Sequence, residues 1–209
     1  QTPQVWLDHQ VYEENGDYAV GIFSSGWCQF LDQASRNLCD TDENQKALES
    51  GKWLCHESCW KDASKVTIDT GQPNDIECQG GIRLYATPII VGGKPIGSIN
   101  FGYGDPPKDL KKLHELAEEY DVDTNRLKEL ADSYESRPSF IVEVAKKRLS
   151  TSAKLIGEIV ERKLAEKELN RYKEQLEGLV KERTTNLEKE IAERKQGEEL
   201  IRASLKEKE

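Results

Sequence analysis

The sequence predicts a small α+β domain followed by one long, solvent-exposed helix. Residues 1–105 mix short apolar runs with Gly and Pro, as strands and turns do, whereas residues 106–149 read as short helices. Residues 150–209 keep a helical period throughout, and Pro106-Pro107 marks the first boundary. The chain has 209 residues, of which 36% are hydrophobic and 33% charged. That composition supplies one core of moderate size and a long solvated segment.

Three strands are expected in the first part of the chain. Residues 17–23 form a short apolar and aromatic run that is typical of a strand. Two further runs, residues 82–91 and 95–101, flank the sequence Val-Gly-Gly-Lys at residues 91–94. A tight turn rich in glycine between two such runs predicts a β-hairpin.

Two short helices are expected from their terminal residues. Thr41 or Asp42 can cap a helix that ends at Gly51. Residues 123–124, Asp-Thr, can cap a second helix, and Pro138 closes it because the residue before a proline avoids helical geometry.

The cysteines give the strongest chemical signal. Cys39, Cys55, Cys59 and Cys78 are four thiols, and the second and third stand one helical turn apart. Soft thiolates gather in this way around a structural metal, so we expect about one zinc ion per chain, held by these four residues. Buried free thiols or disulfides are the alternatives that the spacing leaves open. Cys28 lies in an apolar stretch and is expected to belong to the core.

The histidines do not complete a catalytic motif. Cys55-His56-Glu57-Ser58-Cys59 reverses the order of a haem attachment motif, and the sequence at His114 lacks the second histidine of a zinc protease. We therefore expect the chain not to be an enzyme. A cysteine nucleophile is the least favoured alternative, because no histidine pairs convincingly with a thiol.

Charge and hydropathy limit the partners. The formal net charge is −9, while residues 161–209 contain thirteen Lys or Arg and thirteen Glu, so the negative charge belongs to residues 1–160. An acidic domain is a poor nucleic-acid binder, because contacts with phosphate supply much of that affinity. No run of eighteen apolar residues and no signal peptide occurs in the sequence, so we expect no membrane partner and a cytoplasmic location.

Five aromatic residues form a candidate wall for a small organic ligand. Their apolar faces would give affinity and their NH or OH groups would fix orientation, although aromatic residues are more often simply core. The set is Trp27, Trp53, Trp60, Tyr85 and Tyr103.

The C-terminal segment predicts a coiled coil. A narrow apolar stripe on a highly charged helix must be buried against another helix, and pairing of two identical chains is the commonest solution. We therefore expect a parallel homodimer through this helix. The stripe comprises Leu169, Tyr172, Leu176, Leu179, Val180, Leu187 and Ile191.

The sequence resembles the PocR sensory domain in two segments. They are residues 75–89 (Asp-Ile-Glu-Cys-Gln-Gly-Gly-Ile-Arg-Leu-Tyr-Ala-Thr-Pro-Ile) and residues 96–107. The resemblance covers roughly residues 15–160. It implies a PAS-like antiparallel sheet with flanking helices that senses small alcohols or related compounds. Cysteines recur in that family, and the resemblance places them on Cys39, Cys59 and Cys78, with Cys55 as an addition. Residues 164–176 are similar to linkers that precede a further PAS or histidine-kinase module.

The sequence is thus interpreted as the cytoplasmic input domain of a signal-transduction protein, expected to be a histidine kinase of a two-component system. It would bind a small organic ligand, hold zinc and signal through a dimeric coiled coil. The main alternative is a thiol redox sensor that uses Cys55 and Cys59.

Overall fold

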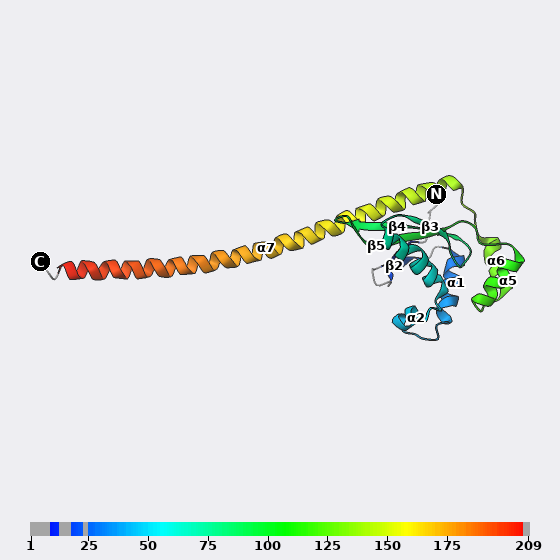
Figure 1. The fold of residues 1–209 in the computed structure, drawn as a ribbon, viewed down its shortest axis with the longest axis horizontal. Helices are drawn as coiled ribbons and strands as arrows, with labels where there is room; N and C mark the ends of the chain where they lie inside the picture. Colours follow the sequence, from blue (N-terminus) through cyan, green and yellow to red (C-terminus); the bar gives the residue numbers. More distant parts are fainter. Residues whose placement is uncertain (1–8, 13–17, 23–24, 207–209) are drawn as a thin grey trace, which may run out of the picture. The chain divides into compact units, whose positions relative to one another are not determined.

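A five-stranded antiparallel sheet forms the framework of the domain in a computed structural model that describes residues 9–12, 18–22 and 25–206 (Figure 1). The strand order is β2-β1-β5-β4-β3. The α+β class and the PAS-like antiparallel sheet with flanking helices are confirmed. The strands are β1 (His9–Tyr12), β2 (Tyr18–Ile22), β3 (Asn74–Glu77), β4 (Arg83–Val91) and β5 (Lys94–Tyr103).

The hairpin of β4 and β5 forms where the sequence predicts it. Val91 pairs with Lys94, and Gly92 and Gly93 have φ angles of 55° and 79°. A two-residue turn with both φ angles positive matches the right-handed twist of the strands, and glycine adopts it without steric cost. The expected strand at residues 17–23 is β2, and its two end residues lie outside the described residues.

The helices are more numerous than the sequence suggests. Before β3 the chain forms α1 and α2, then a continuous helical stretch of α3, η1 and α4. After β5 come α5, α6 and the long α7. Their bounds are α1 (Gly26–Asn37), α2 (Asn44–Ser50), α3 (Leu54–Glu57), η1 (Ser58–Lys65), α4 (Val66–Thr70), α5 (Leu110–Glu119), α6 (Thr124–Ser133) and α7 (Ser139–Lys206).

The predicted helix ends are partly correct. Gly51 ends α2 with a φ of 68°, and Asp123 caps α6 by accepting from the backbone N–H of Asn125 at 2.6 Å. The start of α2 differs, because Glu43 occupies the cap position and the Thr41 hydroxyl accepts from its N–H instead. The long helix begins at Ser139 rather than near residue 150.

The two faces of the sheet have different neighbours, because side chains alternate along β4 and β5. Odd-numbered residues such as Ile89, Ile99 and Phe101 pack against α7, which contributes a buried row of small and apolar side chains. Even-numbered residues such as Leu84 and Ala86 pack against η1. The buried row on α7 comprises Ala145, Leu149 and Ala153.

The chain divides into two compact units, residues 1–160 and residues 161–209. The first contains the sheet, the shorter helices and the start of α7, and the second is the remainder of that helix together with the C-terminal residues. None of the helices among the described residues combines the length and the apolar character that crossing a membrane requires.

Candidate functional site

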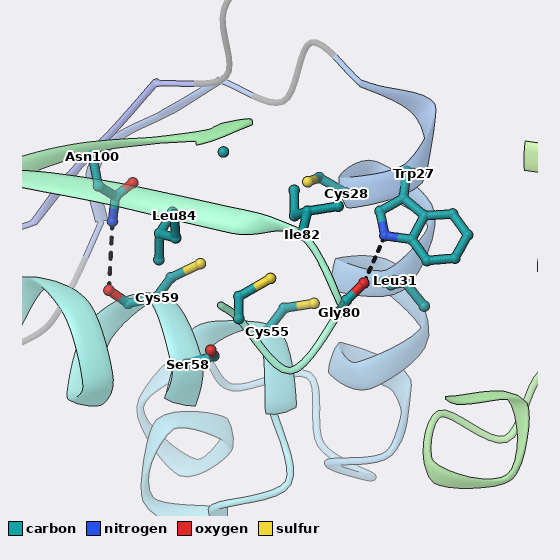
Figure 2. Close-up of a pocket in the computed structure, with 12 residues that line it drawn as sticks. Trp27, Cys28, Leu31, Cys55, Ser58, Cys59, Gly80, Ile82, Leu84 and Asn100 are labelled. Atoms are coloured by element: carbon teal, nitrogen blue, oxygen red, sulfur yellow. Dashed lines mark hydrogen bonds between the residues drawn. The ribbon is translucent and has the colours of Figure 1, made fainter. Parts of the chain in front are cut away.

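A small, mostly apolar cavity lies on the even-numbered face of the sheet (Figure 2). The centres of water-sized spheres can reach about 40 Å³ of it. One water needs about 10–15 Å³ of such space, so the cavity has room for about three waters or a ligand of a few non-hydrogen atoms. Its lining comprises Trp27, Cys28, Leu31, Cys55, Ser58, Cys59, Cys78, Gly80, Ile82, Leu84, Asn100 and Gly102.

An unusual helical segment places two of these residues. η1 is an eight-residue π-helix, a form that is rare and is frequently found at functional sites. In a π-helix each N–H bonds the carbonyl five residues back, so residues five apart lie on one side. Ser58 and Ala63 obey this spacing and are both buried, and Ser64 is buried five residues after Cys59.

Trp27 closes one side of the cavity. Its indole Nε1 donates to the carbonyl of Gly80 at 2.9 Å, which ties α1 to the loop between β3 and β4. A side chain on Gly80 would approach Leu31 Cδ1 at 3.1 Å. This loop, residues 78–81, is called the cavity loop below.

Asn100 carries an unpaired polar atom in the cavity wall. The side chain is 1% exposed, and its Nδ2 donates to Ser64 Oγ at 3.0 Å and to the Cys59 carbonyl at 3.4 Å. A carbonyl can only accept, so the amide nitrogen must face it, and Figure 2 shows the amide oxygen turned the other way. Asn100 Oδ1 is buried and has no hydrogen-bond partner among the described residues. A buried acceptor without a donor destabilises the folded state, and a donor that reaches it removes this cost.

Burial favours the protonated form of three cavity thiols. Burial is the main cause that raises the pKa of Cys55, Cys59 and Cys78 above the ordinary value of a thiol, and at Cys55 and Cys59 the neighbouring thiols add to it. Cys55 also lies 3.6 Å from the hydroxyl of Tyr120. A protonated thiol is a weak nucleophile and reacts slowly with oxidants. These cysteines therefore act as small apolar wall groups in this state.

The structure separates the four cysteines expected to bind zinc. Cys55, Cys59 and Cys78 line the cavity, but Cys39 packs with Ala47 and Trp53 in another cluster. The thiol that joins the first three is Cys28, which the sequence interpretation assigned to the core. Among the residues that the structure describes, no three His, Cys, Asp or Glu side chains are placed to hold a metal ion.

The aromatic residues expected to line one pocket are also dispersed. Only Trp27 borders the cavity. Trp53 is buried beside Cys39 and donates from Nε1 to Asp32 at 2.8 Å. Tyr85 and Tyr103 belong to the face of the sheet that packs against α7, and Trp60 on η1 is half-buried outside the lining.

The sequence interpretation did not include the polar and glycine members of the lining, which are Ser58, Gly80, Asn100 and Gly102. A signal for Asn100 existed, because it is a polar residue between the apolar residues Ile99 and Phe101 of an expected strand. A polar residue at an inward position of a strand indicates either a buried hydrogen bond or a ligand. For the other three, no sequence pattern indicated the site.

Asp32 beside the cavity cysteines should make stability depend on pH. Burial is the main cause that raises its pKa from 3.8 to about 6, and the hydrogen bond from Trp53 opposes it. Because the folded state holds this proton more tightly than the unfolded state, the contribution of Asp32 is present below pH 4 and is lost as the pH rises to 6. Asp32→Asn cannot ionise and still accepts from Trp53.

The variant should therefore gain about 2–3 kcal/mol relative to the wild type between pH 4 and pH 7, measured by urea unfolding at each pH. The exposed Asp42→Asn is the matched control and should run parallel to the wild type. Parallel curves for Asp32→Asn as well would show that Asp32 is ionised in the folded protein across this range.

Comparison with known proteins identifies the family. The model of the sensory domain found in PocR matches residues 23–169, which is more than half of the chain. No curated protein and no solved structure matches the chain. The matched range contains the cavity, the sheet from β3 to β5 and the start of α7. The chain belongs to the family of the sensory domain found in PocR, and its role is sensory input.

Proposed function

We propose that the cavity binds a small, uncharged molecule that carries one hydrogen-bond donor, and that its occupancy is the signal that the domain passes on. The observation that carries this proposal is made on Asn100, which lines the apolar cavity and whose buried Oδ1 has no hydrogen-bond partner among the residues that the structure describes. A ligand hydroxyl would donate to it, and the alkyl part would contact Ile82 and Leu84.

The lining argues for a neutral ligand. None of the described lining residues is acidic or basic, and burial raises the pKa of the Cys55, Cys59 and Cys78 thiols, which favours their neutral form. A carboxylate or ammonium group placed there would lose its hydration without gaining an opposite charge. The proposed ligand class is a small aliphatic alcohol, and the same neutral thiols make the redox sensor based on Cys55 and Cys59 the weaker proposal.

Binding of 1-propanol to the full chain, measured by ligand-detected NMR, tests the proposal. A four-atom ligand has a ceiling of about −6 kcal/mol, so the dissociation constant should lie at tens of micromolar or weaker. Asn100→Leu removes the acceptor at similar volume and should weaken binding about tenfold. Ser98→Ala removes another buried oxygen of β5, one that has no hydrogen-bond partner in the described part of the chain and lies outside the cavity lining, and should bind like the wild type.

Undetectable binding by the folded wild type at about 50 mM propanol, roughly a thousandfold above the lowest dissociation constant expected for a four-atom ligand, would refute the alcohol site. So would equal affinity in Asn100→Leu and the wild type. Thermal unfolding of each variant confirms that loss of binding does not come from loss of the fold.

Zinc is the second proposal, because four thiols line one cavity. The set would be Cys55, Cys59 and Cys78 with Cys28 in place of Cys39, and the thiols would have to move together and release their protons to bind it. Metal analysis of protein purified without chelator decides between the two: about one zinc per chain supports the metal, and none leaves the neutral cavity.

The output part of the proposal concerns α7. The domain would act in a homodimer through the C-terminal helix and would pass its signal to a kinase or a further sensory module at the end of that helix. The support is the apolar stripe on residues 161–199, whose larger side chains are about half or more exposed in the single chain. A stripe of this kind is stabilised by a second helix.

A further inference from the structure

Asp75 on β3 joins three other elements of the domain. Its Oδ1 accepts from Arg83 Nη2 on β4 at 2.6 Å and from the Tyr103 hydroxyl on β5 at 2.7 Å. Its Oδ2 accepts from Lys146 Nζ on α7 at 2.8 Å. Burial alone would raise the pKa of Asp75, but the hydrogen bonds from Lys146, Tyr103 and Arg83 leave that pKa lowered. The carboxylate is therefore ionised and fully partnered.

Lys146 joins the long helix to the sheet through an ion pair with Asp75. The other ion pairs among the described side chains of α7 join residues three or four positions apart in the helix itself. The Lys146 side chain is only 20% exposed, and its Nζ lies 4.7 Å from the centre of the Tyr103 ring and 5.3 Å from that of Tyr85. The rings screen the pair from water, so it contributes more than a surface ion pair does.

The same strand leads directly to the cavity. β3 ends at Glu77, and the next residues form the cavity loop, of which Cys78 and Gly80 line the cavity. The loop is short and tied at its base, because the Cys78 N–H donates to the Ile82 carbonyl at 2.8 Å. Asp75 lies on β3 only three residues before Cys78.

From this arrangement we infer that Asp75 and Lys146 form a latch through which the cavity sets the position of the first turns of α7. The inference rests on the proposed function of the cavity and adds the route by which occupancy leaves it. Filling the cavity displaces the cavity loop, the loop moves Asp75, and the Asp75–Lys146 bond weakens. A ligand can shift this equilibrium only by binding the unlatched state more tightly than the latched one.

The apolar contacts of α7 remain when the latch opens. Ala145, Leu149 and Ala153 stay packed against Ile89 and Phe101, so the helix loosens without leaving the sheet. The small side chains of this row interlock weakly, which allows a slight rotation or shift of the helix. The latch therefore acts on the position of the helix more than on the stability of the fold.

Amide hydrogen exchange of the full chain tests the latch without any ligand. Gly80→Ala is the stand-in for occupancy, because its methyl group would meet Leu31 Cδ1 at 3.1 Å and Cys78 Sγ at 3.6 Å and so push on the cavity loop. Lys146→Met removes the latch but keeps the alkyl chain. The control Lys154→Met makes the same change to a lysine that pairs only within α7 and is 78% exposed.

Lys146→Met should speed exchange in residues 142–150 about tenfold, and Gly80→Ala should speed it about threefold. When both substitutions are combined, the exchange rate of these residues should equal that of Lys146→Met alone within about twofold. The Asp75–Lys146 bond through which Gly80→Ala would act is then already absent. Lys154→Met should exchange like the wild type. Amides of β4 serve as the internal reference for unfolding of the whole domain.

The latch would be overturned if the increases in exchange rate caused by Gly80→Ala and Lys146→Met multiply fully in the double variant. Equal exchange rates for Lys146→Met and Lys154→Met would also overturn it. If Gly80→Ala speeds β4 as much as α7, Gly102→Ala, whose methyl would meet Ile82 Cδ1 at 3.0 Å, takes its place in the same cycle. The exchange experiment uses no ligand, so its outcome does not depend on whether propanol binds. Propanol binding likewise does not depend on the outcome of the exchange experiment, so the two proposals can fail separately.

Discussion

Gly157→Ala is expected to destabilise the sensory domain by about 2–4 kcal/mol. A Cβ atom built on Gly157 would overlap the carbonyl oxygen of Ile90, at the end of β4. Both atoms of this contact belong to the backbone or are fixed to it, so neither can turn away as a flexible side chain does. The helix must move off the sheet or the hairpin must bend, and either change disturbs the packing of Ile156 beside it.

Gly178→Ala is the matched control in the same helix. Apart from the backbone of the helix itself, no described atom lies within 4 Å of the Cβ position at Gly178, and alanine is about 1 kcal/mol better than glycine in a helix interior. The two substitutions should therefore have opposite signs in urea unfolding. A Gly157→Ala protein as stable as the wild type would show that α7 does not approach Ile90 this closely.

Tyr172→Asp together with Leu176→Asp is expected to dissociate the proposed dimer. The two side chains are 60% and 61% exposed in the single chain, and in a parallel pair each would face its own counterpart. Two carboxylates per chain at that seam would lose their hydration and repel their counterparts. Together with the lost apolar contact, this should weaken association by at least about 4 kcal/mol, or about a thousandfold.

Sedimentation equilibrium of the full chain checks this expectation. Asn170→Asp together with Gln175→Asp adds the same two charges to neighbouring positions off the stripe and should leave the dimer intact. A wild type that sediments as a monomer would refute the assembly. Dissociation of both double variants would show that net charge, not the stripe, controls association.

Local signals in the sequence were sufficient for the elements that depend on backbone geometry. Gly92-Gly93 specified the hairpin turn, Asp123 specified the start of α6, and Gly51 specified the end of α2. Each depends on one or two residues and their nearest neighbours, so no tertiary information is needed.

The membership of the cavity depends on which way each side chain points, and spacing alone does not give that direction. Cys39 follows the end of α1, and its thiol lies 3.6 Å from the carbonyl of Ser35 in the preceding turn. Cys28 shares a face of α1 with Leu31, three residues on, and this places it in the cavity. The sequence interpretation did not recognise α1 as a helix, so it grouped Cys39 rather than Cys28 with Cys55, Cys59 and Cys78.

The π-helix η1 is a second feature that the sequence interpretation did not predict. Ser58 and Ala63 are buried together at a spacing of five, which a search for helical periods of 3.6 does not find. The start of α7 was missed for a related reason, because Ala145 and Ala153 are small and give a weak hydrophobic period. Their burial depends on the sheet beneath them.

β3 also disfavours one way in which copies of this protein could associate. It is an edge strand of only four residues, and two of them, Asp75 and Glu77, carry carboxylates. An edge that is short and charged offers a poor template for a strand from another molecule. The strand that carries the latch residue Asp75 thus also disfavours edge-to-edge growth of the sheet at this edge.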